Sequence, residues 1–199
     1  MKLIQSYYCN TDTIQLSKNI LGKKLVTNIN NQITSGLIVE TESYLGINDK
    51  ASHAYRGNKT SRTKVMFKQG GVAYIYLCYG LHYLFNIVCN LKNIPHSILI
   101  RAVEPIDGIE HMMKRRKHIR MNKNISNGPG KLSQALGITT QLNNKSLIDN
   151  NLWIEDIGYE ISDKNILSVP RIGVDYAQED AKLPYRFYIR NNNWVSQKQ

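Results

Sequence analysis

Two glutamates, a tyrosine and a histidine stand close together in residues 36–53, GLIVETESYLGINDKASH. Side chains alternate between the two faces of a strand, so Glu40, Glu42 and Tyr44 are predicted to share one face. Two carboxylates this close are costly to ionise together, which favours one of them as a general base. The same row is typical of the solvent-facing edge of an amphipathic strand, and the pattern alone leaves both interpretations open.

Acidic residues are missing from two long stretches of the chain. No Asp or Glu occurs between Asp49 and Glu104, nor between residues 111 and 148, and both stretches are rich in Lys and Arg. They hold most of the excess of 26 basic over 15 acidic residues, a net charge of +11. Such segregated charge favours a polyanionic partner. AT-rich coding also raises the Lys and Asn content, but it does not explain why the acids avoid two windows.

Length and composition limit the number of domains and the class of protein. A chain of 199 residues with 42% hydrophobic content predicts one domain around one core. The amino terminus lacks a signal-peptide core and no apolar run reaches the roughly 18 residues that span a bilayer, so we expect an intracellular protein with no membrane partner. Three cysteines without CxxC spacing indicate a reducing compartment, and five unclustered histidines give no support for a metal or other cofactor.

The predicted elements follow an α+β order. A short helix capped by Asn10 or Thr11 precedes strands at residues 24–28 and 36–44, and the aperiodic residues 46–70 predict a long, functional loop. Strands at 72–79 and 83–90 are expected to meet in a hairpin at Tyr79 and Gly80. A strand at 97–103 is predicted to lead through Pro105 into a helix. A shorter helix at 131–136 and a last strand in the tail complete the order.

Several familiar motifs are excluded. The string GPGKL at residues 128–132 lacks the first Gly and the final Ser or Thr of a phosphate loop, and we interpret it as a turn into a helix whose free amides could hold one backbone phosphate. The zinc-deaminase signature and the GxSxG motif of serine hydrolases are absent from the sequence.

The ordered motifs of the chain resemble one family from end to end. They are IVETESYLG, ASHAYRG, YIYLCYG, LIRAVEP, GPGKLSQALGI, RIGV and PYRFYIR, and their spacing is similar to that of the alkyladenine (3-methylpurine) DNA glycosylases of the mammalian type. The resemblance implies a single domain, residues 1–199, with a curved, mainly antiparallel sheet (a roll or partial barrel) flanked by short helices. It also implies a monomer that, in a bacterium, acts in the cytoplasm at the nucleoid.

The resemblance implies a role for each matching residue of the reaction centre. Glu42 matches the general base that activates water, and Arg101 matches a residue near that water and the target phosphate. Glu40 matches a second, structural carboxylate.

The same resemblance implies how damaged DNA is held. Tyr44, His53 and Tyr76 match the pocket for an extruded base, and Asn86 matches the gate that disfavours the guanine amino group. Tyr79 matches the wedge that fills the vacated gap, although tyrosines here are also typical of sheet packing. Further DNA contacts are expected from the basic residues Arg56, Lys59, Arg62 and Lys131.

The implied reaction is hydrolytic removal of alkylated or deaminated purines, such as 3-methyladenine, ethenoadenine or hypoxanthine, from double-stranded DNA, leaving an abasic site. A hydrolase using Glu40 and Glu42 as acid and base is disfavoured, because same-face neighbours lie ~6.5 to 7 Å apart and cannot flank a bond. A non-catalytic module that binds nucleic acid by shape remains open.

Overall fold

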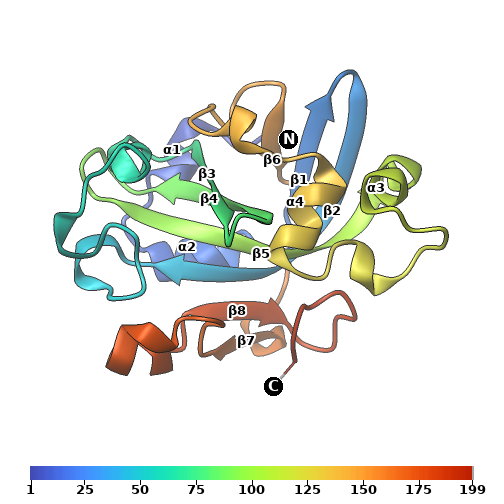
Figure 1. The fold of residues 1–199 in the computed structure, drawn as a ribbon. Coiled ribbons are helices and arrows are strands. Elements are labelled where there is room, and N and C mark those ends of the chain that lie inside the picture. The colour runs from blue at the N-terminus through green and yellow to red at the C-terminus, as the bar shows by residue number, and fades with distance from the viewer. Residues whose placement is uncertain (199) are drawn as a thin grey trace.

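One eight-stranded sheet, antiparallel at every pairing, frames the computed structural model, which describes residues 1–198 (Figure 1). The path β3-β4-β5-β2-β1-β6 is extended by β8, which pairs with β2 and carries β7. The strands are β1 (Lys24–Ile29), β2 (Gln32–Tyr44), β3 (Val72–Cys78), β4 (His82–Cys89), β5 (His96–Asp107), β6 (Leu152–Glu155), β7 (Ile166–Val169) and β8 (Arg186–Ile189). The expected curved, mainly antiparallel α+β fold is confirmed.

The sheet divides into two branches along one edge of the long strand β2. Its first half pairs with β1 and its second half with β8, while β5 runs along its other edge. In Figure 1 the β1–β2 hairpin therefore rises to one side and the β7–β8 pair lies below.

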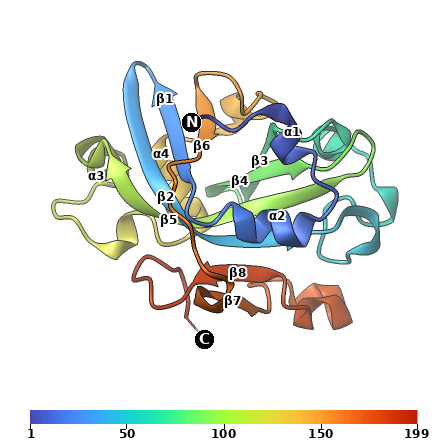
Figure 2. The same cartoon turned by 180° about the vertical axis from the view of Figure 1, so that it is seen from behind.

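Four short helices flank the sheet: α1 (Gln5–Tyr8), α2 (Thr13–Asn19), α3 (Ile109–Arg116) and α4 (Pro129–Leu136). Figure 2 shows α1 and α2 on the side turned away from the viewer in Figure 1. The predicted cap of the first helix was wrong by one or two residues. The Asp12 carboxylate accepts from the Gln15 amide, whereas the Asn10 side chain accepts from the Asp12 amide and so cannot cap the helix.

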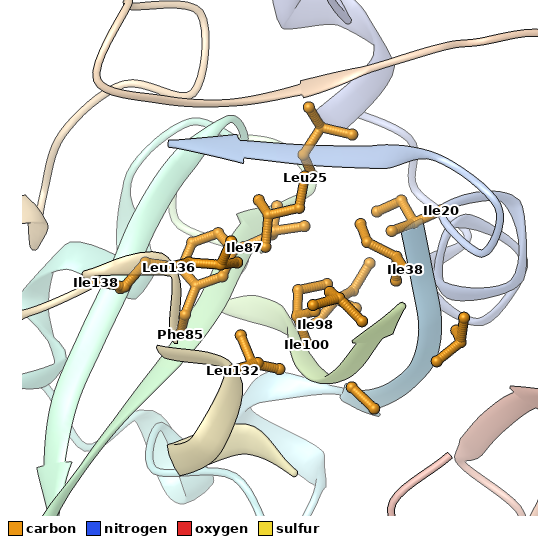
Figure 3. Close-up of a cluster of buried hydrophobic side chains, with 14 of the residues drawn as sticks. Ile20, Leu25, Ile38, Phe85, Ile87, Ile98, Ile100, Leu132, Leu136 and Ile138 are labelled. Atoms are coloured by element: carbon orange, nitrogen blue, oxygen red, sulfur yellow. The ribbon is translucent and has the colours of Figure 1, made fainter. Parts of the chain in front are cut away.

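The hydrophobic core fills the inside of the curl (Figure 3). Alternate residues of two central strands face it, because side chains of a strand point to opposite faces. The helices contribute at their own spacing. Fully buried members are Ile20 at the C-cap of α2, Leu25, Ile38, Phe85, Ile87, Ile98 and Ile100 of the sheet, and Leu132 and Leu136 of α4.

The structure corrects the predicted end of β5. Pro105 lies within that strand, opposite Gly36, and α3 begins only at Ile109 after Gly108 with a φ of 68°. A register shift between Ser35 and Gly36 marks a bulge there, and a bulge tolerates a residue without an amide hydrogen. Strands β6 and β7 were not predicted, since four residues each are too few for a clear alternation.

Two irregular segments meet at one end of the sheet, on the left in Figure 1. Residues 46–70 form the predicted long connection and contain the short 3₁₀ turns η1 (Gly46–Asn48), η2 (Tyr55–Gly57) and η3 (Thr63–Phe67). The second segment, residues 170–185, connects β7 to β8 and contains η7 (Asp175–Lys182). Arg171 joins the two through an ion pair with Asp49. Among the described residues, no helix has the length and apolar character needed to cross a membrane.

Candidate active site

A row of four residues crosses four strands of the sheet. Tyr74 on β3 lies opposite Asn86 on β4, Asn86 lies opposite Leu99 on β5, and Leu99 lies opposite Glu42 on β2. Directly opposed residues of antiparallel strands project from the same face. The row therefore brings a carboxylate, an amide and a phenol, far apart in sequence, onto the face opposite to the core.

A cavity of about 590 Å³, the aromatic cavity, opens on this face. The sheet forms its floor, and the two irregular segments supply its walls. Of the predicted site residues, those that line it are Tyr44, His53, Arg62, Tyr76, Tyr79, Asn86 and Arg101. Arg56, Lys59 and Lys131 are not among its lining residues, and Glu42 lies directly behind the lining.

The Glu42 carboxylate is fully buried and held by three donors. Its Oε2 accepts from the Tyr44 hydroxyl at 2.9 Å and pairs with Nη1 of Arg101 at 3.2 Å, and its Oε1 accepts from the Ile172 amide at 2.9 Å. All three partners line the aromatic cavity. The carboxylate is thus fixed one layer behind the cavity wall, in the preorganised setting typical of a catalytic group.

Arg101 reaches both carboxylates of the predicted row. It has no register partner in β2, since its neighbours Ile100 and Ala102 take the positions opposite Thr41 and Glu40. From this bulge its Nε contacts Oε1 of Glu40 at 3.2 Å. Burial acts to lower the pKa of Arg101, but the two carboxylates outweigh burial and raise it. The guanidinium therefore stays charged and compensates the expected repulsion between the glutamates.

Both carboxylate oxygens of Glu40 accept hydrogen bonds from other parts of the protein. Besides Arg101, it accepts from Nη1 of Arg186 at 2.8 Å and from both the amide and the hydroxyl of Ser196, at 2.7 and 2.9 Å. It is fully buried and is absent from the cavity lining. These contacts hold Ser196 and β8 against β2.

Three aromatic rings form the wall opposite Glu42. The His53 imidazole lies 4.7 Å from Tyr76 between ring centroids, and its Nδ1 shares a 2.8 Å hydrogen bond with the Tyr74 hydroxyl. Burial, with a smaller contribution from Arg62, lowers the pKa of His53 to about 4. Burial raises the pKa of Tyr74 to about 12 and that of Tyr76 further. This wall is consequently neutral at physiological pH.

Asn86 lies on the floor of the cavity, with only 3% of its surface exposed. Its Nδ2 donates to the main-chain oxygen of Tyr74 at 3.3 Å, which fixes the orientation of the amide. The partner of Tyr76 across the hairpin is Leu84, whereas Asn86 is opposite Tyr74. Asn86 therefore lies two residues further from the turn than the position opposite Tyr76.

Tyr79 is at the tip of the β3–β4 hairpin and is 91% exposed. The Leu81 amide donates to the Cys78 oxygen, which closes a β-turn whose central residues, Tyr79 and Gly80, have φ values of 49° and 69°. A positive φ is unusual for a tyrosine. The sheet-packing alternative for this residue is wrong, since the ring projects into solvent at the cavity rim.

The outer basic residues Arg56, Lys59 and Lys131 lie on separate segments outside the cavity lining. Arg56 and Lys59 are exposed, and each cation lies over a ring of its own loop, Tyr55 and Phe67 respectively. Lys131 on α4 donates to the side chains of Asn124 and Asn127. Its helix starts at Pro129, which lines the cavity, and Gly130 packs so closely against His82 that a Cβ would lie 2.8 Å from that ring.

Sequence reasoning missed the wall formed by residues 172–176. Ile172, Gly173, Val174 and Tyr176 line the cavity more than 120 residues away from Glu42. The signal was the motif RIGV, residues 171–174, which supported the family resemblance but was assigned no role in the site. Arg171 makes a bidentate pair with Asp49, at 2.5 and 2.9 Å, and also donates to the oxygen of Ser43. Within residues 1–198, no group of His, Cys, Asp and Glu could hold a metal ion.

Comparison with known proteins identifies the family of this site. The family model described as "Methylpurine-DNA glycosylase (MPG)" matches residues 7–193. The chain belongs to the methylpurine-DNA glycosylase family. The resemblance seen in the sequence motifs is therefore confirmed. As a member of this family the protein is a DNA N-glycosylase, which hydrolyses N-glycosyl bonds, and its substrate is DNA.

Curated relatives of this glycosylase match over nearly their whole length. A protein of Chlamydia felis is 46% identical over 188 residues, which cover 94% of this chain and 95% of that protein. One of Clostridium acetobutylicum is 44% identical over 203 residues, covering 98% of each chain. Both bear the name "Putative 3-methyladenine DNA glycosylase".

Proposed function

We propose that this glycosylase rotates a damaged purine out of double-stranded DNA into the aromatic cavity and removes it by hydrolysis. The lesions are alkylated purines of the 3-methyladenine type, together with ethenoadenine and hypoxanthine. The observation that carries the proposal is the placement of the buried Glu42 directly behind an aromatic-walled cavity whose rim bears the exposed Tyr79.

The base must rotate out of the duplex because Glu42 is otherwise inaccessible to it. The Glu42 carboxylate lies behind the cavity wall, so a base stacked in a duplex cannot reach it. Rotating a base outward costs roughly a few kcal/mol, and least for a damaged or mispaired one. In our proposal Tyr79 enters the gap and restores stacking, while Arg56, Lys59, Arg62 and Lys131 neutralise phosphates of the strand.

The aromatic wall suits an alkylated base. A purine methylated on its ring carries a positive charge, which aromatic faces attract and a charged imidazole would repel. The lowered pKa of His53 keeps that ring neutral beside Tyr76. Asn86 is proposed to obstruct the amino group of guanine from the cavity floor, so that undamaged guanine is not accepted.

Glu42 is proposed to act as the general base. Breaking the glycosidic bond leaves a sugar with oxocarbenium character, which a nearby carboxylate stabilises while it takes a proton from the attacking water. The water must reach Oε2, where the Tyr44 hydroxyl now donates. Arg101 is proposed to orient the carboxylate and contact the target phosphate. Arg101 pairs with both glutamates, so its positive charge faces the base in its buried setting.

The product is proposed to be an intact strand with an abasic site. A strand-cleaving glycosylase needs an amine that forms a Schiff base with the sugar, and no lysine lines the cavity in the described part of the chain. The proposed reaction requires water and no cofactor. We further propose that the enzyme works as a monomer on chromosomal DNA at the nucleoid.

A lesion panel tests the proposed function. Duplexes carrying 3-methyladenine, ethenoadenine or hypoxanthine at one position are incubated with the enzyme and then treated with alkali, which cuts at abasic sites. Strand cleavage only after alkali supports a monofunctional glycosylase and ranks its lesions. Absence of cleavage for all three lesions would exclude the proposal, and cleavage without alkali would exclude the proposed product.

A further inference from the structure

A second hollow, of about 510 Å³, lies beside the active site and is bordered by lysines. Its cations are Lys59, Lys64, Lys68 and Lys92, and its apolar surface comes from Phe67 and Val72. We name it the lysine hollow. The segment that carries η3 borders both cavities: Arg62 and Met66 line the aromatic cavity, whereas Lys64, Phe67 and Lys68 line the lysine hollow.

The charges of the lysine hollow have no counter-ion within the protein. All four lysines are exposed, and no Asp or Glu is among the residues that border the hollow. None of them takes part in an ion pair within residues 1–198. Four like charges around one concave surface repel one another, so an anion with several charges is the ligand that relieves this repulsion.

The frame that carries the lysines is ordered by main-chain contacts. The Asn93 amide donates to the Phe67 oxygen at 2.9 Å, the Lys92 amide donates to Oε1 of Gln69, and the Gln5 side chain donates to the Gly70 oxygen. These bonds use the backbone and the amide side chains and leave the ammonium groups of Lys64, Lys68 and Lys92 available. The surface is therefore held in shape before any ligand arrives.

The distance from the lysine hollow to the proposed wedge fits one nucleic-acid strand. Val72 borders the hollow at the start of β3, and Tyr79 follows the other end of that strand, so at ~3.3 Å per residue the two lie on the order of 20 Å apart. Phosphates of one DNA strand follow each other by ~3.4 Å along the helix axis. A DNA strand opened at Tyr79 therefore extends phosphates to the lysine hollow about six nucleotides away.

We propose that the lysine hollow binds the phosphates of the damaged duplex on one side of the lesion, about six nucleotides from it. The proposal rests on the proposed function for the position of the lesion. It adds Lys64, Lys68 and Lys92 to the DNA-binding surface and gives this surface a direction, because the hollow borders only one side of the aromatic cavity.

The test compares two double variants. Lys64→Gln/Lys68→Gln removes two cations of the hollow, and Lys164→Gln/Lys198→Gln removes two exposed lysines elsewhere as a matched control. Binding to an undamaged duplex of about two helical turns is measured against salt concentration, with thermal melting to confirm the fold. Each lost phosphate contact lowers the slope of log affinity against log salt by ~0.9, so we expect a decrease of about 1.8 for the first variant and little for the control.

Direction is tested with lesion duplexes extended on one side only. The wild type should gain affinity from an extension on either side, and the Lys64→Gln/Lys68→Gln variant should lose about 10-fold with one of the two extensions. An unchanged slope, an equal loss in the control variant, or an equal loss with both extensions would overturn the proposal. Binding to undamaged DNA tests the lysine hollow even if the enzyme excises no lesion. Failure of the hollow proposal is therefore distinguishable from failure of the proposed function.

Discussion

The main-chain amide of Ile172 donates a 2.9 Å hydrogen bond to Oε1 of Glu42, across 130 residues of sequence. The amide is held in place by its neighbour, because the Arg171 guanidinium is clamped to Asp49 and to the oxygens of Ser43 and Asp180. The orientation of the proposed base therefore depends on a segment that belongs to neither of the strands that carry Glu42 and Arg101.

Replacing Glu42 with Gln should stop catalysis while leaving DNA binding. The amide keeps the shape of the carboxylate but cannot take a proton from water, so single-turnover excision should fall by ~100-fold or more. Binding to lesion DNA, measured by fluorescence anisotropy, should remain within a few fold of the wild type. Near-normal excision by Glu42→Gln would contradict the assignment.

Replacing Glu40 with Gln is the matched control and should act on stability. This side chain accepts hydrogen bonds from two buried arginines and from Ser196. Weakening a buried ion pair destabilises a protein by up to about 3 to 5 kcal/mol, which urea unfolding would detect. At a temperature where the variant is folded, we expect substantial excision. A loss of excision in Glu40→Gln together with normal activity in Glu42→Gln would reverse the two roles.

His53 should stay neutral well below pH 6.5. Its pKa is lowered from 6.5 to about 4, so the unfolded chain binds this proton more readily than the folded protein. The stabilisation from the neutral ring is complete above pH 6.5 and is lost as the pH falls toward 4. NMR titration of the imidazole, with His53→Gln to assign the signal, measures this pKa directly. A titration midpoint at or above pH 6.5 would contradict the conclusion that the His53 imidazole is kept neutral by burial.

Removing the ring of Tyr79 should weaken lesion recognition without loss of stability. The side chain is 91% exposed, and stacking of a ring on a base contributes ~1 to 3 kcal/mol, so Tyr79→Ala should bind abasic DNA about 10-fold less tightly and excise more slowly. The salt dependence should keep its slope, because no phosphate contact is lost. Tyr79→Gly is the matched variant, since glycine favours the positive φ of this turn. Normal binding by both variants would exclude a wedge.

Shortening Asn86 should widen the range of accepted bases. Asn86→Ser leaves space on the cavity floor where the amide now stands, and discrimination against guanine should relax by roughly 10-fold in competition assays. The lost bond to the Tyr74 oxygen costs about 1 kcal/mol of stability. Ser97→Ala alters another buried polar residue of the same cavity and should leave guanine discrimination intact. Unchanged discrimination in folded Asn86→Ser would exclude a gate.

The sequence by itself determined the local features of this protein. Alternation placed Glu42 and Tyr44 on one face, Tyr-Gly marked the hairpin tip, and the lack of period in residues 46–70 marked a long loop, because these signals depend only on neighbouring residues. The order of the motifs was enough to identify the family. The boundaries of elements were less certain, since a bulge at Gly36 allowed Pro105 to remain inside β5.

Only the tertiary structure decided which of two similar carboxylates is connected to the aromatic cavity. Glu40 and Glu42 have nearly the same sequence context, and they differ because Arg186 and Ser196 enclose the first while Tyr44 and Ile172 connect the second to the cavity. Three of these partners, Arg186, Ser196 and Ile172, meet the glutamates from 130 or more residues away along the chain. No local pattern encodes that meeting, because it results from the register and curl of the whole sheet.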